Sequence, residues 1–441
     1  MNKFHKIEKC RVCGNEHLIT VLDLGDQFLS GIFPKTIDLG MYKGPLALVK
    51  CDEKKGGCGH VQLEHTFDLP TMYGDEYGYR SGLNGSMIRH LREKAEKIKA
   101  DTNLDSGDIV VDIAGNDGTF LGFFPHDLQL MSIDPTSKKF KEYIPDHVNH
   151  IADFFSADTY RERFGKQKAK VVTSFSMFYD LEDPCEFARQ VHEILDCHGI
   201  WVLEQSYMPE MLKQNSFDTV CHEHLSYYGM RQLKYIMDKA GFKIVDFEFN
   251  DVNGGSISVV VTPSTNSERK ECTTKLTGLI ALEIEKKLDT IEPWEEFAQR
   301  INDCKELELE NKLDTIEPWE EFAQRINDCK EQFWKIIDFY KGNGAKICCL
   351  GASTKGNVTL QTWEVTPDDV EMIGDVNPDK DGSFTPGTWI PIKDEEDVLM
   401  RDYDLHIVLP WHFRNFFLKN EKFKGKRFLF PLPEPEVVIA P

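Results

Sequence analysis

Residues 109–121, IVVDIAGNDGTFL, constrain the fold of this chain more than any other stretch. The apolar run 109–111 is typical of a buried strand and ends in Asp112. The turn that follows contains Gly115 and Gly118, so a ligand can approach the main chain closely. A second apolar strand, near 130–134, ends in Asp134. A carboxylate there is placed to accept hydrogen bonds from two ribose hydroxyls, which predicts a nucleoside-binding sheet edge.

The residues of the turn favour one nucleoside cofactor over another. A nicotinamide dinucleotide normally needs a G-x-G-x-x-G turn around its pyrophosphate, whereas this turn reads A-G-N-D-G. The carboxylate of Asp117, inside this turn, would repel a pyrophosphate and attract a sulfonium or amino group. We therefore expect S-adenosylmethionine (SAM), unless the turn is an ordinary one after a buried strand. The expected ligands are Asp112, Gly115, Asn116, Asp117, Gly118, Asp134 and, at the adenine amino group, Asp153, which could equally be a helix N-cap.

Composition restricts the class of partner. The 441 residues are enough for two or three domains, and the net charge of −22 argues against nucleic acid or an anionic membrane. A small phosphorylated ligand in a local basic pocket remains compatible with that charge. The N-terminus lacks an apolar signal core, and no run approaches the roughly 18 apolar residues of a membrane span. The 12 scattered cysteines favour a reducing compartment. We expect a cytoplasmic monomer or homodimer.

Two cysteine pairs near the N-terminus predict a structural metal site. Cys10 and Cys13 form a C-x2-C knuckle, and Cys51 and Cys58 form a wider C-x6-C pair. Four thiolates would hold one zinc ion in a closed tetrahedral site and stabilise a module with little core of its own. His60 could replace Cys58 as a ligand. The alternative is a set of reduced, buried cysteines.

The middle of the chain alternates strand and helix patterns, which predicts a doubly wound parallel sheet. Ligands of such sheets lie at the carboxyl ends of the strands. Tyr79, just upstream, could belong to a substrate wall or to an interface between modules. Strands are expected near 109–112, 130–134, 170–174, 199–204, 243–248 and 256–261, and helices near 87–99, 184–196 and 230–241.

The segment Cys221-His-Glu-His-Leu-Ser-Tyr-Tyr228 concentrates reactive side chains after a predicted strand. A histidine titrates near neutral pH and suits proton abstraction, and a neighbouring Glu223 can orient it. The pair His222 and His224 could instead bind a metal, although no third ligand stands nearby in the sequence.

Residues 282–306 and 307–331 are a tandem repeat that differs at only two positions, Ile284/Leu309 and Lys286/Asn311. An added copy of this length keeps a helical apolar face nearly in phase. Pro293 and Pro318 suit a first helical turn. We therefore expect two helices, or one helix broken near Pro318, that carry no chemistry.

The C-terminal part repeats the strand–turn–helix theme. An apolar strand at 346–350 is followed by Gly351-Ala-Ser-Thr-Lys-Gly-Asn357, a small-residue turn that could hold a phosphate group. Strands near 371–375 and 404–409 support a second Rossmann-like unit. We expect Lys355, Asn357 and, from the earlier segment, His222 to contact the substrate.

Taken together, these motifs resemble the sugar C-methyltransferases of the tylosin-pathway type, which act on nucleotide-linked 4-keto-deoxysugars. The resemblance covers nearly the whole chain. It rests on both cysteine pairs with Val61-Gln-Leu63, the N-D-G-T turn at 116–119, HEHLSYY at 222–228, Asn253-Gly-Gly-Ser256, GASTKGN at 351–357, and Asn377-Pro with Pro386-Gly-Thr and Ile390-Pro-Ile392.

The resemblance implies three modules and a catalytic set. The second histidine of H-E-H is implied to be the base, which maps to His224, with Glu223 as its helper and Tyr79 as the matching tyrosine. The chain departs from the family pattern at Ala114, where a glycine is usual, and at Cys221, where a tyrosine is frequent. The extra 25-residue copy is the third departure.

The predicted function is therefore SAM-dependent C-methylation next to the ketone of a nucleotide-linked 4-keto-deoxysugar. The alternatives are an O-methyltransferase for a sugar or small molecule, and a non-catalytic zinc- and nucleotide-binding scaffold. The expected organisation is a zinc module at 1–70, a SAM domain at 71–262, connecting helices at 263–335 and a Rossmann-like domain at 336–441.

Overall fold

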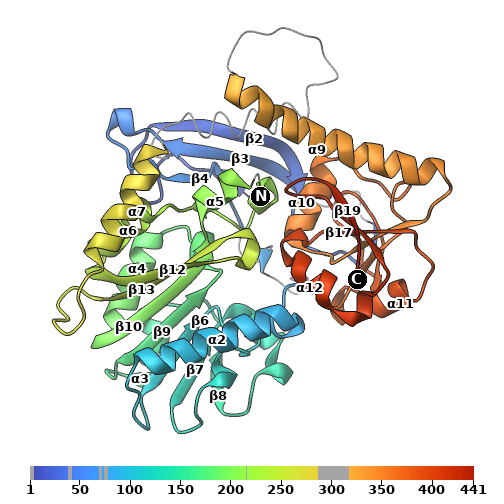
Figure 1. Cartoon of the computed structure of the whole chain (residues 1–441). Helices are drawn as coiled ribbons and strands as arrows, with labels where there is room; N and C mark the ends of the chain where they lie inside the picture. The colour runs from blue at the N-terminus through green and yellow to red at the C-terminus, as the bar shows by residue number, and fades with distance from the viewer. Residues whose placement is uncertain (1–3, 38–41, 69–71, 74–77, 215, 287–316) are drawn as a thin grey trace.

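The computed structural model describes residues 4–37, 42–68, 72–73, 78–214, 216–286 and 317–441. Two α/β units lie side by side, and a β-rich N-terminal module lies over the end of the first unit and reaches toward the second (Figure 1). No helix among these residues is long and apolar enough to cross a membrane.

The central unit is a seven-stranded sheet in the order β12-β13-β10-β9-β6-β7-β8. The sequence predicted a parallel sheet, and one strand departs from it, because β13 runs antiparallel to both of its neighbours. The short connection at 251–255 makes a hairpin of β12 and β13, and a hairpin can only join antiparallel strands. The strands are β6 (Ile109–Ile113), β7 (Gln129–Ile133), β8 (Val148–Ile151), β9 (Ala169–Phe175), β10 (Leu195–Ser206), β12 (Phe242–Asn250) and β13 (Ser256–Pro263).

Helices cover both faces of this sheet, as a doubly wound fold requires. Successive residues of β6 point to opposite faces: Val110 packs with the α2 side chains, whereas Val111 packs with α4 and α6. Side-chain caps fix two helix starts, Asn84 at α2 and Asp183 at α4. The helices are α2 (Gly85–Asp101), α3 (Ala157–Phe164), α4 (Pro184–Ile194), α5 (Met208–Lys213), α6 (Met230–Lys239) and α7 (Thr273–Glu285).

The N-terminal module contains a two-stranded and a four-stranded sheet. The fourth strand of the larger sheet is β11, the Ser226–Tyr227 segment of the HEHLSYY motif, which pairs antiparallel with β4. The module is therefore completed by a segment that is distant in sequence. Its strands are β1 (Phe4–Lys6), β2 (Leu18–Phe28), β3 (Lys43–Cys51), β4 (Val61–Leu63), β5 (His65–Phe67) and β11 (Ser226–Tyr227).

The C-terminal unit is a six-stranded sheet in the order β16-β15-β14-β17-β18-β19, parallel except for β19. The chain reverses its strand order between β14 and β17, as in a Rossmann fold. Its elements are α9 (Glu317–Gly342), β14 (Ile347–Leu350), α10 (Thr354–Thr362), β15 (Ile373–Asp375), β16 (Ile392–Asp394), α11 (Glu395–Leu399), β17 (Leu405–Val408), α12 (Arg414–Lys419), β18 (Arg427–Phe430) and β19 (Glu436–Ile439).

The tandem repeat falls mostly outside the described residues. Its first residues end helix α7, and most of its second copy belongs to α9, which begins at Glu317, one residue before Pro318. The first expected helix, around Pro293, lies outside the described part of the chain. Pro318 lies in the first described turn of α9, and the residues before Glu317 are outside the described part as well, so the expected break near Pro318 stays a prediction.

Direct hydrogen bonds join the three parts of the molecule. The Asn357 amide donates to the Ser30 carbonyl at 2.7 Å, and Lys355 Nζ donates to the Asn253 carbonyl at 2.7 Å. Trp411 Nε1 donates to Asp218 Oδ2 at 3.0 Å. Parallel strands all end at the same edge of their sheet, and in the central unit this edge faces the junction. The candidate site therefore lies where the N-terminal module, the central unit and the C-terminal unit meet.

Candidate active site

A cavity of about 230 Å³ lies at the carboxyl edge of the central sheet. We call it the sheet-edge cavity. It is lined on one side by the β6 turn and the end of β7 and on the other by the segment before α2 and the segment after β9. The residues include Tyr73, Tyr79, Ser81, Met87, Ala114, Asn116, Asp134, Thr136, Phe154, Phe175, Ser176, Met177, Asp180, Glu182 and Leu225.

Asp134 lies in this cavity as predicted, held by the backbone around it. Its Oδ2 accepts from the Asn116 backbone N–H at 2.8 Å. Its Oδ1 accepts from the Thr136 backbone N–H and from the Thr136 hydroxyl, each at 2.6 Å. These bonds fix the orientation of the carboxylate beside the turn, where a ribose would have to bind.

Three residues of the turn that follows β6 have a left-handed backbone conformation, with positive φ. Ala114 has φ 59°, Asn116 φ 52° and Gly118 φ 73°. Ala114 therefore occupies, at a cost of about 1–2 kcal/mol, a conformation that glycine adopts freely. Gly115 is required for another reason: a Cβ there would lie 2.6 Å from Ser132 Oγ and 2.8 Å from Asp112 Oδ2.

Two acids of the turn do not line the cavity. Asp112 is buried and accepts from Thr173 Oγ1 at 2.6 Å, and burial raises its pKa to about 7. The sequence placed Asp117 beside a cationic ligand, but its carboxylate accepts from the Gly82 N–H at 2.8 Å and from Thr119 Oγ1 at 2.6 Å. The structure thus uses Asp117 to tie the segment before α2 to the turn.

Asp153 does not line the sheet-edge cavity, whereas the next residue, Phe154, does. It is exposed, and its Oδ1 accepts from the N–H of Phe154 at 2.7 Å. The alternative of a helix N-cap is wrong, because Ser156 caps α3, and the contact with the adenine amino group stays a prediction. Phe154, which lines the cavity and is 45 % exposed, is the residue that the sequence reasoning missed. An exposed aromatic beside a nucleoside cavity offers a flat face for a base, and its position after a strand was the available signal.

His224 lies beside the sheet-edge cavity and not in its wall. It lines a very small neighbouring pocket of about 10 Å³ with Tyr179, whose ring centroid is 4.2 Å from the imidazole. The His224 Nδ1 and the Thr219 carbonyl oxygen are 2.8 Å apart. A carbonyl can only accept, so this bond fixes the Nδ1–H tautomer and leaves Nε2 with a free lone pair. Burial and the nearby Lys355 ammonium lower the pKa of His224 to about 3.

Glu223 is buried against the N-terminal module. An ideal Cβ on Gly31 would lie 2.1 Å from Glu223 Oε1, so only a glycine fits at that close approach. Burial raises the pKa of Glu223, and this effect outweighs the hydrogen bonds from Gly31 and Ser30, which lower it. Its Oε2 has no hydrogen-bond partner among the described residues. Cys221, fully buried, carries a thiol whose pKa is raised by burial and by Glu223.

His222 points away from His224. Its Nε2 lies 3.4 Å from the Gly44 carbonyl oxygen, and its ring meets the Phe67 ring edge-on at 4.6 Å. Burial lowers its pKa to about 4. The residue lines neither the sheet-edge cavity nor the small His224 pocket, and its contact with the substrate stays a prediction. Among the described residues, neither His222 nor His224 belongs to a group of three or more possible metal ligands.

Lys355 reaches the junction, and Gly351 at the start of the preceding turn packs against Pro410. The Lys355 ammonium faces Asp218 and His224, and burial lowers its pKa. Gly351 is left-handed, and a Cβ there would lie 2.6 Å from Pro410 Cδ, so this position has no room for a side chain. The binding of a phosphate group by the rest of the turn stays a prediction. Asn357 is fully buried and joins the C-terminal unit to the N-terminal module.

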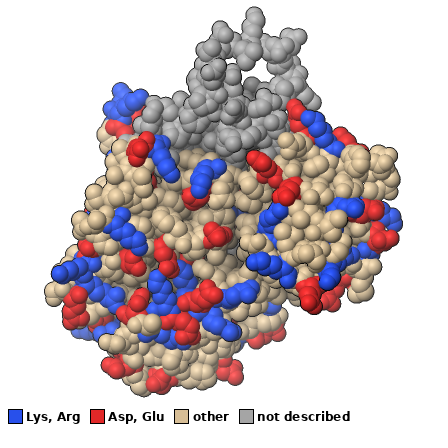
Figure 2. Space-filling view, in the orientation of Figure 1, with Lys and Arg blue, Asp and Glu red and all other residues tan. Residues whose placement is uncertain are grey.

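A larger cleft of about 570 Å³ opens between α2, the loop after β12 and the region of α12. We call it the interunit cleft. Its cations Arg89 and Lys419 are exposed, and its rings are Phe413 and Phe416. Figure 2 shows Lys and Arg side chains on both sides of the junction between the two α/β units. The sequence reasoning did not single out these residues because α2 and α12 are far apart in the chain.

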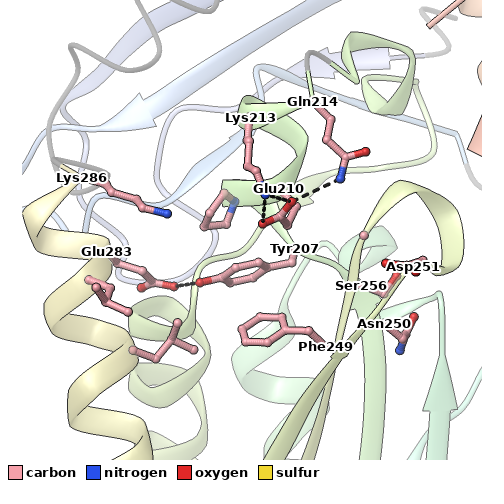
Figure 3. Close-up of a pocket in the computed structure, with 14 residues that line it drawn as sticks. Tyr207, Glu210, Lys213, Gln214, Phe249, Asn250, Asp251, Ser256, Glu283 and Lys286 are labelled. Atoms are coloured by element: carbon pink, nitrogen blue, oxygen red, sulfur yellow. Dashed lines mark hydrogen bonds and ion pairs between the residues drawn. The ribbon is translucent and has the colours of Figure 1, made fainter. Parts of the chain in front are cut away.

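A third cavity, of about 410 Å³, lies between α5, α7 and the end of β12 (Figure 3). Its buried acid, Glu283, is fully engaged: Oε1 accepts from the Tyr207 hydroxyl at 2.6 Å and from the Met230 N–H at 2.7 Å. Oε2 accepts from the Arg231 N–H at 3.2 Å. Glu283 therefore caps the N-terminus of α6 from another helix, and we assign it a structural part.

The four predicted cysteines form one cluster. The Sγ atoms of Cys10, Cys13, Cys51 and Cys58 all lie within 4.8 Å of one another. The Cys10–Cys58 and Cys13–Cys51 sulfur pairs are 3.7 Å and 3.5 Å apart. Tetrahedral zinc with Zn–S bonds of about 2.3 Å needs sulfur separations of about 3.8 Å, so the donor set fits the ion. His60 is not a member, because its Nε2 bonds Ser226 Oγ at 3.1 Å.

Family models match almost every part of the chain. A zinc binding domain matches residues 10–73, a methyltransferase domain matches residues 85–246, and a C-methyltransferase C-terminal domain matches residues 251–309 and 300–433. The two C-terminal matches overlap inside the tandem repeat, as expected when a segment of a family domain has been duplicated.

The C-methyltransferase NovU of Streptomyces niveus is 27 % identical over 443 residues, which is 98 % of this chain and 97 % of NovU. Among solved structures, a chain of the complex between the Haloferax volcanii Trm112 methyltransferase activator and a methyltransferase has a TM-score of 0.33 at 14 % identity, over 41 % of this chain and 96 % of that one. A SAM-dependent methyltransferase from Clostridium acetobutylicum has a TM-score of 0.31 at 10 % identity, over 40 % of this chain and 92 % of that one.

The relative and the three family models agree in chain order with the four-cysteine cluster, the Asp134 sheet edge and the second α/β unit. Of the predicted alternatives, the non-catalytic scaffold is therefore set aside, and C-methylation is favoured over O-methylation. The cofactor is SAM, and the cysteine cluster is a zinc site. The chain is therefore a SAM-dependent methyltransferase with a zinc-binding module, and it is similar to C-methyltransferases over nearly its whole length.

Proposed function

We propose that the enzyme methylates the carbon next to the ketone of a nucleotide-linked 4-keto-deoxysugar, with His224 as the base that removes the carbon-bound proton. The observation that carries the proposal is the state of His224: a neutral imidazole whose Nδ1–H is held by the Thr219 carbonyl and whose Nε2 is free to accept a proton.

The position of this imidazole supports the assignment. Ser176 lines the sheet-edge cavity, and its side chain is 3.2 Å from that of Asn253, which follows the cleft residue Val252. Lys355 bonds the Asn253 carbonyl and faces His224. A methyl acceptor that reaches this point from the cleft would therefore meet the imidazole and an ammonium group together.

The interunit cleft supports a nucleotide-linked acceptor. Arg89 and Lys419 are exposed cations that can pair with a diphosphate, and Phe413 and Phe416 offer rings for a base. This local basic lining explains how a chain with a net charge of −22 can hold an anionic substrate.

In the proposed reaction the C–H bond next to the ketone breaks, and its proton passes to His224 Nε2. The electron pair enters the enolate, whose negative charge raises the proton affinity of the adjacent imidazole. Bound SAM would supply an electrophilic methyl group: the enolate carbon would bond to this methyl group while the methyl–sulfur bond breaks, which leaves S-adenosylhomocysteine as the neutral thioether. Asn116, Asp134 and Thr136 would hold its nucleoside, and Glu223 and Tyr79 would shape the acceptor side. His224 then releases its proton to solvent.

The test is His224→Ala, with His198→Ala as the matched control because His198 is an exposed residue beside Glu268. We expect His224→Ala to bind S-adenosylhomocysteine normally by calorimetry and to lose both methyl transfer and solvent deuterium exchange at the sugar carbon. A panel of dTDP-, GDP- and CDP-4-keto sugars identifies the acceptor, and NMR of the product locates the new methyl group. Exchange at the wild-type rate in His224→Ala refutes the assignment of the base.

A further inference from the structure

Asp180 is a cavity acid that the proposed reaction leaves unused. It ends the short turn Phe178–Asp180 that follows β9, and it lines the sheet-edge cavity near Tyr73 and Tyr79. Its Oδ1 is buried and has no hydrogen-bond partner among the described residues.

The other acids on the same wall differ from Asp180. Both oxygens of Asp134 accept hydrogen bonds from the protein. Glu182 has a side chain that is 60 % exposed and lies 3.4 Å from His5 Nε2. Among the described acids of this wall, only Asp180 combines burial with an unused oxygen. A buried polar atom without a partner is costly, and at a binding site it points to a ligand group that satisfies it.

The surroundings of Asp180 favour its protonated form. Burial raises its pKa well above the ordinary aspartate range, and the nearby Glu223 raises it further. A hydrogen bond with Tyr73 acts in the opposite direction and is the weaker effect. The described groups that act on Asp180 include no cation that would favour the carboxylate.

A neutral carboxyl group has one O–H donor, and Asp180 therefore needs a ligand that accepts. A SAM amino or sulfonium group cannot accept a hydrogen bond, whereas a ketone oxygen can. We propose that Asp180 is a further catalytic residue, whose O–H group binds the ketone oxygen of the methyl acceptor and stabilises the enolate oxygen. This inference rests on the proposed function and names the group that holds the reacting carbonyl.

The electron balance of this step is simple. When the proton leaves carbon for His224, the C–H pair forms the carbon–carbon double bond and the carbonyl pair moves onto oxygen. The Asp180 O–H keeps its own proton and shortens its hydrogen bond to the charged oxygen. Carbon–methyl bond formation reverses these shifts and restores the ketone. Asp180 supplies no proton and no oxidant is needed.

Two substitutions separate donation from charge. Asp180→Asn keeps the shape and an N–H donor, whereas Asp180→Leu removes every polar atom. We expect Asp180→Asn to retain kcat within about tenfold and Asp180→Leu to lose about 10²–10³-fold, the usual effect of deleting one oxyanion donor. Both should bind S-adenosylhomocysteine as the wild type does. Asp402→Asn, an exposed acid-to-amide change in the C-terminal unit, is the control that should alter nothing.

A measurement without substrate makes the outcome independent of the proposed sugar. The infrared difference spectrum of wild type minus Asp180→Asn at pH 7 should contain the carbonyl band of one protonated carboxyl group, shifted in D₂O, because Asp112 and Glu223 are present in both proteins and cancel. Absence of that band overturns the inference and leaves the proposed function standing. The inference about Asp180 is also overturned if Asp180→Asn is as inactive as Asp180→Leu, or if either variant no longer binds S-adenosylhomocysteine. A wild type that methylates no 4-keto sugar instead refutes the proposed function, and the ketone partner of Asp180 with it.

Discussion

Gly31 of the N-terminal module lies so close to Glu223 that adding one methyl group, in Gly31→Ala, should displace the Glu223 carboxylate and disturb the candidate active site. In Gly31→Ala the new Cβ would lie 2.1 Å from Glu223 Oε1 and 3.2 Å from its Cδ. Real Cβ atoms essentially never approach a heavy atom closer than 3.0 Å, so the carboxylate must move by about 0.9 Å. Gly31 does not have a positive φ, so the effect is steric and does not come from backbone strain.

The displaced atom ends a flexible side chain, which limits the cost in stability. Overpacking a tight site costs about 1–3 kcal/mol, and we expect the lower end here. The effect on rate should be larger, because a misplacement of about 1 Å in a catalytic group can lower the rate about 10²-fold. Gly31→Ala should therefore fold, bind S-adenosylhomocysteine and lose most of its methyl transfer.

The assay follows methyl uptake from labelled SAM into the 4-keto sugar, together with the unfolding midpoint. Gly278→Ala is the matched control, because Gly278 lies in α7 with nothing within 4 Å of a Cβ placed there. That variant should keep full activity and gain about 0.5–1 kcal/mol in stability. The reasoning is refuted if Gly31→Ala transfers methyl groups at the wild-type rate, or if it fails to fold while Gly278→Ala folds normally.

Three further predictions follow from the other sites. Asp134→Asn should weaken S-adenosylhomocysteine binding about tenfold to a hundredfold by calorimetry, with little change in the unfolding midpoint. The reason is the loss of about 1.5–3 kcal/mol of charge-assisted hydrogen bonding to the ribose. Unchanged affinity would contradict the ribose assignment. Cys13→Ser should lower the zinc content measured by mass spectrometry below one ion per chain and destabilise the fold, whereas Cys197→Ser, at an exposed thiol, should do neither. Glu204 is buried and pairs with His90 at 2.5 Å and Lys94 at 2.7 Å, so Glu204→Gln should lose about 3 kcal/mol in urea unfolding at pH 7. Burial acts to raise the pKa of Glu204, but these partners lower it below its ordinary value. The stabilisation is therefore present above the ordinary glutamate pKa of about 4.3 and is lost as the pH falls through the lower folded value, so the difference between Glu204→Gln and wild type should shrink in acid.

The sequence alone predicted the features that depend on local pattern. Buried strands ending in Asp134, a turn that needs Gly115, and cysteine pairs at zinc-binding spacing are determined by neighbouring residues. The parallel order of the central strands followed from their alternation with helices. The antiparallel β13 was missed because a short connection decides strand direction more strongly than the general pattern does.

Only the tertiary structure decided which side chains face a cavity. Asp117 carries the right charge for a cationic ligand, but the Gly82 N–H, distant in sequence, takes its carboxylate. Phe154 becomes a candidate through an exposed ring beside the cavity, and Asp180 through a buried oxygen without a partner among the described residues, which no spacing in the sequence encodes. Which polar groups find hydrogen-bond partners depends on the packing of the whole molecule. In this protein the packing gives the Asp117 carboxylate a structural part and leaves an oxygen of Asp180 for a ligand.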